Sequence, residues 1–345
     1  TPQLARAAVI EVTTLVDQDS GPACSLRNAI LAANQNAPSG GCPAGDGDDR
    51  IELGGLTGLI ELVAALPTIA GNGESTVIHG PGADRLTVSG IAAFVVFTTA
   101  EAFSQDTTIE GLTIYRGYGT CVFAEGFLTL RACRITGCLV DHNFGSPVIS
   151  IGGYTGIGQL RMVNSTVSNN QGGILFANVE GPGGLNRIWA STLVENGSAN
   201  LDVGADQQVR IDHTILKQTP RRGFTPVDCV LGGTVFRPPG TPNLYSSASL
   251  ASDASCGLAG PLDRENVDPL LDELADNGGP TATRALIPGS VAIDGGDTVC
   301  TGPDAALTVD QRGAGHPRPV PGVLGAAALC DIGAFEVPEP DPGLA

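Results

Sequence analysis

Arg210, Asp212 and His213 lie close together in the sequence and carry side chains that could perform acid–base catalysis. A polysaccharide lyase needs a base near the C5 proton of a uronic acid and a cation that neutralises the adjacent carboxylate. Arg210 and Asp212 could supply these two groups, and His213 could act as the base. A glycoside hydrolase would instead need two carboxylates at a fixed separation. Since no spacing among the acidic residues singles out such a pair, these three residues are the catalytic candidates.

Arg161 and Arg187 are candidates for binding an anion, because they occupy the same position in two neighbouring repeats of the sequence. Stacked strands lie about 4.8 Å apart, and two guanidinium groups at that distance repel each other unless an anion lies between them. That anion could be a carboxylate or sulfate of a polysaccharide, or an Asp or Glu of the protein itself. Trp189, the only tryptophan, could stack on a sugar ring or pack beneath a loop.

Asp46, Asp48, Asp294 and Asp297 stand in Gly-spaced acidic turns that resemble calcium-binding loops, because this ion prefers oxygen ligands. Neither turn has the full twelve-residue pattern with its terminal Glu. Calcium is therefore a possible cofactor, and an ordinary Asp-Gly turn is the alternative. The four histidines are scattered along the chain, which argues against a transition-metal site.

The charge balance narrows the class of partner. Among 345 residues, 18 Lys and Arg oppose 36 Asp and Glu, which gives a formal net charge of −18. Binding to nucleic acid or to an anionic membrane surface relies on clustered cations, so both are disfavoured. The sequence contains no run of about 18 apolar residues, the length needed to span a bilayer, and we expect no membrane insertion. A polysaccharide or a surface protein is the favoured partner, while the oligomeric state stays open.

Nine cysteines without any Cys-x-x-Cys motif favour an exported, disulfide-bonded protein over a cytosolic metal-binding one. The chain begins at Thr1 rather than Met, and we expect a processed form. Three sequence-local pairs are expected, namely Cys24 with Cys42, Cys229 with Cys256, and Cys300 with Cys330. The other three cysteines, Cys121, Cys133 and Cys138, leave at least one thiol unpaired, and a buried core thiol is the simplest interpretation.

A seven-residue pattern recurs five times in the middle of the chain and determines the expected fold. The segments are Thr108–Ile114, Thr129–Ile135, Arg161–Val167, Arg187–Leu193 and Val209–Ile215. A constant unit joined by loops of variable length is typical of a solenoid. Aliphatic or Met side chains stand at the last position and five positions earlier, where Arg210 is the one exception. In this alignment His213 falls in an inward column with Cys133, Ser165 and Ser191, which favours a buried histidine.

The segments predict strand, corner, strand and loop in each coil. Three positions before the last aliphatic stands a small or turn-tolerant residue, such as Gly111, Ala132 or Asn164, which suits a bend between two short strands. Asn170 and Asn196 fall in register after the second strand and could hydrogen-bond from coil to coil. Stacked coils of this kind form an all-β parallel β-helix with an aliphatic interior.

Both ends of the solenoid should be capped, because open strand edges promote aggregation. Residues 1–50 should form an N-terminal cap with an amphipathic helix that begins near Ser25 and buries Ile30. The coils should fill residues 51–216. Residues 217–345 lose the repeat and hold four of the nine cysteines, so we expect a disulfide-tied C-terminal cap and a Pro-rich tail.

Motifs at both ends resemble those of a family of exported bacterial proteins. The segment Cys24-Ser-Leu-Arg-Asn-Ala-Ile30 is similar to the Cys-Ser-Leu-Arg-Glu-Ala opening of that family, with Asn28 in place of the usual Glu. The later motifs, similar to a C-terminal domain found ahead of varied surface anchors, are Leu274-Ala-Asp-Asn-Gly-Gly-Pro-Thr281, Pro288-Gly-Ser-Val-Ala-Ile-Asp-Gly-Gly296, Asp310-Gln-Arg-Gly313 and Cys330-Asp-Ile-Gly-Ala-Phe-Glu336. The resemblance implies a right-handed parallel β-helix that is secreted or held at the bacterial cell surface. It implies no reaction.

The sequence thus predicts an exported surface or matrix β-helix protein that binds an extracellular polysaccharide or a partner protein through its elongated side face. This hypothesis rests on the lack of a convergent catalytic set in the sequence. The alternative is a polysaccharide lyase or glycoside hydrolase of β-helix type, with Arg210, Asp212 and His213 as its candidates. A structural spacer without a ligand is a third interpretation.

Overall fold

The computed structural model is a right-handed parallel β-helix, as the sequence and its family resemblance predict. It describes residues 8–70, 74–100, 106–139, 147–152, 158–176, 185–205, 207–220, 225–232, 243–303 and 305–340. In this part of the chain, no helix has the length and apolar character needed to span a membrane.

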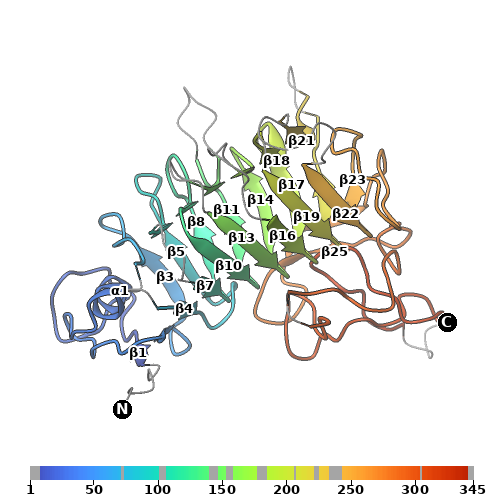
Figure 1. The fold of residues 1–345 in the computed structure, drawn as a ribbon. Coiled ribbons are helices and arrows are strands. Elements are labelled where there is room, and N and C mark those ends of the chain that lie inside the picture. The colour runs from blue at the N-terminus through green and yellow to red at the C-terminus, as the bar shows by residue number, and fades with distance from the viewer. Residues whose placement is uncertain are drawn as a thin grey trace, which may run out of the picture.

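Three parallel sheets form the sides of the solenoid (Figure 1). The nine-stranded sheet contains β1 (Val9–Glu11), β2 (Asp49–Glu52), β4 (Thr76–His79), β7 (Asp106–Glu110), β10 (Phe127–Arg131), β13 (Gln159–Val163), β16 (Leu185–Trp189), β19 (Gln208–Asp212) and β22 (Leu244–Ser247). The eight-stranded sheet contains β3 (Gly58–Glu61), β5 (Leu86–Ser89), β8 (Thr113–Tyr115), β11 (Arg134–Thr136), β14 (Thr166–Asn170), β17 (Thr192–Asn196), β20 (Ile215–Lys217) and β23 (Leu250–Ala251). The six-stranded sheet contains β6 (Phe97–Thr99), β9 (Val122–Ala124), β12 (Ile149–Ile151), β15 (Ile174–Phe176), β18 (Ala199–Val203) and β21 (Val227–Leu231). The last strands of all three sheets lie beyond residue 216, so the coils continue through Ala251.

The fifth repeat is shifted by one residue from the alignment that the sequence suggests. Arg210 pairs with Arg187, and Ile211 pairs with Ile188, so the fifth segment runs from Arg210 to Leu216. A one-residue shift turns every side chain of a strand to the opposite face. Arg210 therefore points outward and does not interrupt the apolar column, which Ile211 continues.

The same shift moves His213 from the predicted inward column to the corner between two strands. Its φ of 49° matches the left-handed corner conformation of Ala132, Asn164 and Ala190. Thr214 takes the place beside Ser191 instead. The prediction of an inward column position for His213 is wrong, while the prediction that this side chain is buried is confirmed.

The interior is a stack of aliphatic ladders with a polar ladder at one edge. Ile109, Leu130, Met162, Ile188 and Ile211 are all fully buried and lie one above another. At the edge, the buried side chain of Asn170 donates from Nδ2 to Oδ1 of Asn196 over 2.8 Å. Asn196 in turn donates to Oδ1 of Asn200 over 3.0 Å and to the carbonyl oxygen of Val167 over 2.8 Å. The predicted hydrogen bond from coil to coil is confirmed.

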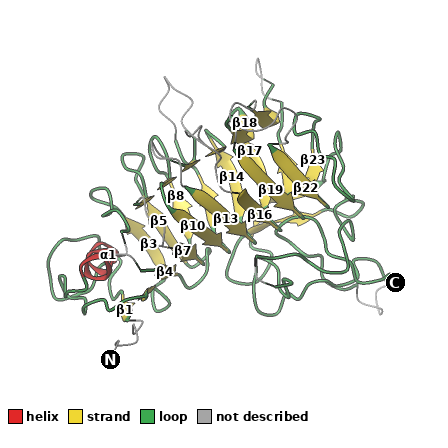
Figure 2. Ribbon diagram, viewed as in Figure 1, coloured by secondary structure: helices red, strands yellow, loops and turns green. Residues whose placement is uncertain are grey.

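A helical cap covers the N-terminal end of the solenoid (Figure 2). The helix α1 (Leu26–Gln35) begins at the N-cap Ser25, as predicted, and packs against β1 and β2. Arg27 forms a buried ion pair with Asp17 over 2.7 Å. Asn28 is also buried and donates from Nδ2 to the carbonyl oxygen of Gln18 over 2.9 Å. The N-terminal motif therefore holds the cap together.

The disulfides tie both ends and one middle coil. The three predicted pairs, Cys24–Cys42, Cys229–Cys256 and Cys300–Cys330, are present, and a fourth joins Cys121 to Cys138. Cys133 is the remaining thiol and is buried. Burial raises the pKa of this thiol to about 12, so it behaves as a core residue rather than a nucleophile.

The C-terminal residues run back along the side of the solenoid rather than only closing its end, as the orange and red segment in Figure 1 shows. We name residues 278–337 the C-terminal strap. Its Pro280 accepts a hydrogen bond from the backbone N–H of Asp84, far towards the N-terminal coils. Gln311 accepts from the hydroxyl of Thr166 over 2.6 Å, and the backbone N–H of Ala334 donates to Thr192 Oγ1. The strap thus covers the corner between the nine-stranded and eight-stranded sheets.

Replacement of Asn196 by Ala should destabilise the protein by about 2–4 kcal/mol, because it leaves several buried polar groups without partners. The exposed Ser198 on the same coil provides the control, and Ser198→Ala should cost less than about 0.5 kcal/mol. Urea unfolding of both variants measures the difference. Equal stabilities would show that the Asn ladder contributes nothing.

Candidate functional site

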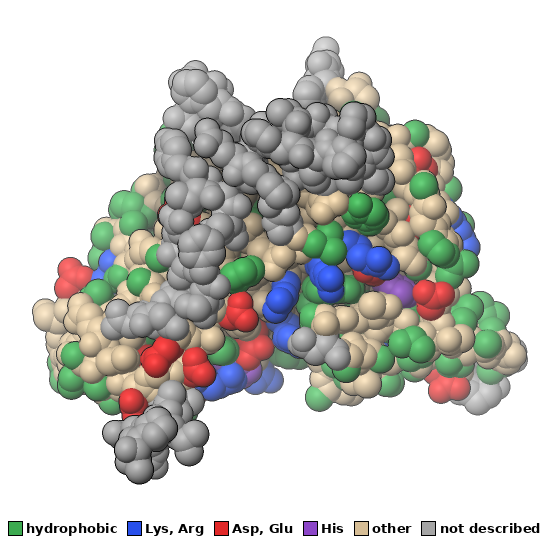
Figure 3. Space-filling model, viewed as in Figure 1, with side chains coloured by type: hydrophobic (Ala, Val, Ile, Leu, Met, Phe, Trp, Pro, Cys, Tyr) green, Lys and Arg blue, Asp and Glu red, His purple; other side chains and the backbone are tan. Residues whose placement is uncertain are grey.

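Three arginines form a column on the outer face of the nine-stranded sheet. Arg161 on β13 pairs in register with Arg187 on β16, which pairs with Arg210 on β19. All three residues are exposed. Adjacent strands lie about 4.8 Å apart, so the column carries a positive charge at each step of the solenoid. Figure 3 shows Lys and Arg side chains gathered in the middle of this face.

The three guanidinium groups differ in their partners. Among the described residues, Arg161 and Arg187 have no acidic partner and form no side-chain hydrogen bond. Arg187 lies over the ring of Trp189, 5.9 Å from its centroid. Arg210 binds Asp212 through Nε at 2.9 Å and Nη2 at 3.0 Å, and this hydrogen bonding raises the pKa of Arg210. Two of the three cations therefore keep their hydrogen-bonding capacity for a ligand.

The arginine column lies in two adjoining hollows of the surface. The first is a pocket of about 180 Å³ that is lined by Gln159, Arg161, Leu185, Arg187, Trp189 and Pro303. Trp189 is only 3% exposed, so its ring packs beneath the surface and forms part of the wall. Pro303, which belongs to the C-terminal strap, lines the pocket together with Trp189. The second pocket, of about 400 Å³, lies between Arg210, Tyr245 and the turn at Gly260.

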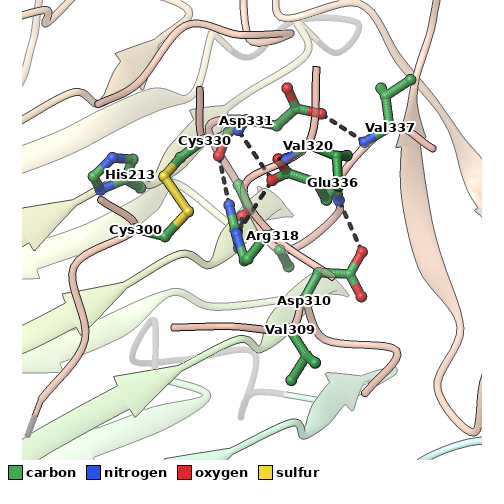
Figure 4. Close-up of polar contacts among 12 residues, drawn as sticks. His213, Cys300, Val309, Asp310, Arg318, Val320, Cys330, Asp331, Glu336 and Val337 are labelled. Atoms are coloured by element: carbon green, nitrogen blue, oxygen red, sulfur yellow. Dashed lines mark hydrogen bonds and ion pairs between the residues drawn. A yellow bond between two sulfur atoms is a disulfide. The ribbon is translucent and has the colours of Figure 1, made fainter. Parts of the chain in front are cut away.

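The structure pairs Arg210 with Asp212 but buries both Asp212 and His213. The carboxylate of Asp212 is 3% exposed and engages Arg210 with both oxygens. His213 is 1% exposed beneath the strap, and its Nε2 accepts the backbone N–H of Asp297 over 3.3 Å. Figure 4 shows it beside the Cys300–Cys330 disulfide. Burial and, to a lesser degree, Arg318 lower the pKa of His213 to about 4, so it is neutral and inaccessible to a polysaccharide.

The four calcium candidates act as parts of turns and loops. Asp48 accepts the backbone N–H of Ser75, and Asp294 accepts that of Gly322. The backbone N–H of Asp46 donates to Asp49, and that of Asp297 donates to His213. In the described ranges, no three His, Cys, Asp or Glu side chains lie close enough together to hold a metal ion. The carboxylates of Asp48 and Asp294 thus accept hydrogen bonds from nearby loops, and calcium binding at these turns stays a prediction.

A second charged cluster on the same sheet escaped the sequence analysis. Glu52, His79 and Glu110 lie in register on β2, β4 and β7, and Nδ1 of His79 lies 2.7 Å from the Glu110 carboxylate. Arg50 reaches Glu52 at 3.0 Å and Glu110 at 3.4 Å. In this cluster Arg50 lies within ion-pair distance of both Glu side chains, whereas Arg161 and Arg187 have no acidic partner among the described residues. The signal for this cluster lies in the preceding residues. An alignment of Ile51, Ile78 and Ile109 places the three charged residues that follow them in one column.

The strap is held by a buried cluster that contains two arginines and three carboxyl groups. Figure 4 shows Arg318 of this cluster with the three carboxyl groups of Asp310, Asp331 and Glu336. Arg318 lies 3.2 Å from Glu336, and Arg312 lies 2.6 Å from Asp310. Asp331 accepts the backbone N–H groups of Asp294 and Val337. Burial raises the pKa of Asp331 to about 6 and that of Glu336 to about 7. With all five groups charged, the cluster would carry an excess negative charge, which a proton bound by Asp331 or Glu336 relieves.

The stability of the protein should therefore fall as the pH rises through the range of these pKa values. Glu336 binds a proton more tightly when folded, with a pKa of about 7 against the usual 4.5, so folding stability is highest at the acidic side and decreases towards pH 7. Asp331 adds to this loss, and His213 opposes it, because a histidine whose pKa is lowered to about 4 stabilises the folded protein more as the pH rises towards 6.5. We expect a net loss of roughly 2 kcal/mol between pH 5 and 8, since each pKa unit corresponds to about 1.4 kcal/mol. Thermal unfolding across this range measures it.

Glu336→Gln should flatten this pH dependence even where it lowers overall stability, because the amide does not titrate. The exposed Glu61 gives the matched control, and Glu61→Gln should keep the full slope. A slope unchanged in Glu336→Gln would place the titrating group elsewhere.

Comparisons with protein-family models, with curated proteins and with solved structures found no match to this chain. The fold and its four disulfides indicate a β-helix protein of an oxidising compartment, either extracellular or periplasmic.

Proposed function

We propose that this protein is a non-catalytic β-helix protein, secreted or held at the bacterial surface, that binds an acidic polysaccharide along the outer face of its nine-stranded sheet. The observation that carries the proposal is the pair Arg161 and Arg187, in register on adjacent strands and without acidic partners among the described residues. Two unit charges about 5 Å apart repel by roughly 1 kcal/mol in water before screening by salt. An anion between them removes this repulsion.

The acidic character of the whole chain makes these exposed arginines distinctive. With a net charge of −18, the protein has an excess of carboxylates that could neutralise them, as Asp212 does for Arg210. Salt limits the reach of the distant negative charges to about 8 Å at physiological ionic strength. A local cationic groove can therefore bind a polyanion on an acidic protein.

The geometry favours binding over turnover. The lyase interpretation needs a base that faces the sugar, yet Asp212 and His213 are buried, and His213 is held beneath the strap. A rigid strand face that presents guanidinium groups at fixed intervals is sufficient for recognition. Arg suits this role because its planar donors match a carboxylate in a bidentate geometry.

Substitution of the arginines tests the proposal. Arg161→Ala and Arg187→Ala should each weaken binding to polygalacturonate about tenfold or more, since a charge-assisted hydrogen bond contributes roughly 1.5–3 kcal/mol. The exposed Arg85, which lies before β5 outside the groove, provides the control, and Arg85→Ala should leave the affinity unchanged. Isothermal titration calorimetry at fixed salt measures the affinities, with neutral dextran as the reference polymer.

Three results would contradict the proposal. Equal affinity of the Arg161→Ala, Arg187→Ala and wild-type proteins would move binding away from the groove. Absorbance from unsaturated uronates, or release of reducing ends, would show that the protein is an enzyme. Binding of an acidic protein segment but of no acidic polysaccharide would replace the polysaccharide with a protein partner.

A further inference from the structure

The arginine column has a fixed spacing, and this spacing carries information about the charge pattern of the ligand. Register pairing places Arg161, Arg187 and Arg210 at successive steps of about 4.8 Å. One hexopyranose residue in an extended polysaccharide advances by nearly the same length. A chain laid along the solenoid axis therefore brings one sugar to each coil.

The column has defined ends. Towards the N-terminus, Arg161 pairs with Thr129, and Thr129 pairs with Thr108, so the positive charge stops there. Towards the C-terminus, Arg210 pairs with Tyr245, whose residue surface is 36% exposed. The Tyr245 hydroxyl accepts a hydrogen bond from Nε2 of Gln208 over 3.0 Å, which holds the ring in place. The groove thus offers three cationic positions followed by one aromatic position.

Described side chains flank the two unpaired arginines on both sides of the pocket. On one side, Nε2 of Gln159 donates to the carbonyl oxygen of Leu185 over 2.8 Å, so this amide is already hydrogen-bonded. On the other side, Trp189 and Pro303 line the pocket. The guanidinium groups of Arg161 and Arg187 lie between these flanks.

We infer that the groove is specific for a contiguous polyuronate, in which every sugar carries a carboxylate, and that it holds about four sugars over Arg161, Arg187, Arg210 and Tyr245. This inference rests on the proposed function. A polymer that is charged on every second sugar brings half as many carboxylates to the column, so fewer of its three guanidinium groups gain an anion. Arg210 is the weakest cationic position, because Asp212 already neutralises much of its charge. The aromatic ring of Tyr245 packs against the apolar face of the fourth sugar.

The experiment measures the affinity of the full chain for oligogalacturonides of one to eight sugars by calorimetry at fixed salt. Affinity should rise severalfold or more with each sugar up to about four. Beyond four sugars it should level off, apart from the small gain that comes from the larger number of registers in which a longer chain can bind. Hyaluronan oligosaccharides of the same length, charged on alternate sugars, should bind at least tenfold more weakly. Tyr245→Ala should weaken the tetramer about fivefold and leave the trimer unchanged, while Thr129→Ala should alter neither more than twofold.

The outcomes separate this inference from the proposed function. If galacturonate polymers bind through Arg161 and Arg187 but affinity keeps rising with length, or hyaluronan binds equally well, the spacing argument is wrong and the groove is a general polyanion site. If no acidic polysaccharide binds, the proposed function is wrong as well. A circular dichroism spectrum identical to that of the wild type excludes misfolding of each variant.

Discussion

In-register pairing of parallel strands is the constraint on which the rest of this structure depends. Each position of a coil is repeated at the same place on the next, so the sequence can only vary in ways that the whole column tolerates. Inward columns become aliphatic ladders such as Ile109, Leu130 and Met162. Outward columns are free of this packing constraint, and they can gather like charges that would be dispersed on a less regular fold. The arginine column is one result of that freedom.

The corner between two sheets imposes a second requirement, because it exposes backbone groups that need partners. The C-terminal strap meets it where Nε2 of Gln311 donates to the carbonyl oxygen of Cys133 and the N–H of Gly333 donates to the carbonyl oxygen of His213. The same cover buries His213, which is therefore a corner residue in a left-handed conformation rather than a base. The motifs that carry the family resemblance at the two ends of the sequence thus have structural roles. The N-terminal motif closes the first coil, and the C-terminal motifs anchor the strap.

Periodicity alone was sufficient to predict the β-helix, the inner ladders and the Asn170 to Asn196 contact, since these depend on contacts between equivalent positions. The register of the fifth coil was predicted wrongly because Thr214-Ile215 imitates the Thr-aliphatic pairs of earlier coils. The sequence did contain a sign of this one-residue shift, because the alignment placed the charged Arg210 in a column of apolar residues. The strap could not be predicted, because it joins residues such as Thr166 and Gln311, 145 positions apart, through contacts that follow no repeat. Without the strap, the wall at Pro303 could not be anticipated either.

The perturbed pKa values of this protein belong to the fold and not to the arginine column. Catalytic groups with shifted pKa values normally face a cleft, where the shift serves proton transfer. Here the large pKa shifts belong to His213, Asp331, Glu336 and Cys133, and all four are buried beneath the strap or in the core. Their shifts arise chiefly from burial within the fold. The groove instead presents guanidinium groups, whose planar donors match a carboxylate. The proposed ligand would therefore be held by charge and hydrogen-bond geometry, at a distance from the buried groups that titrate.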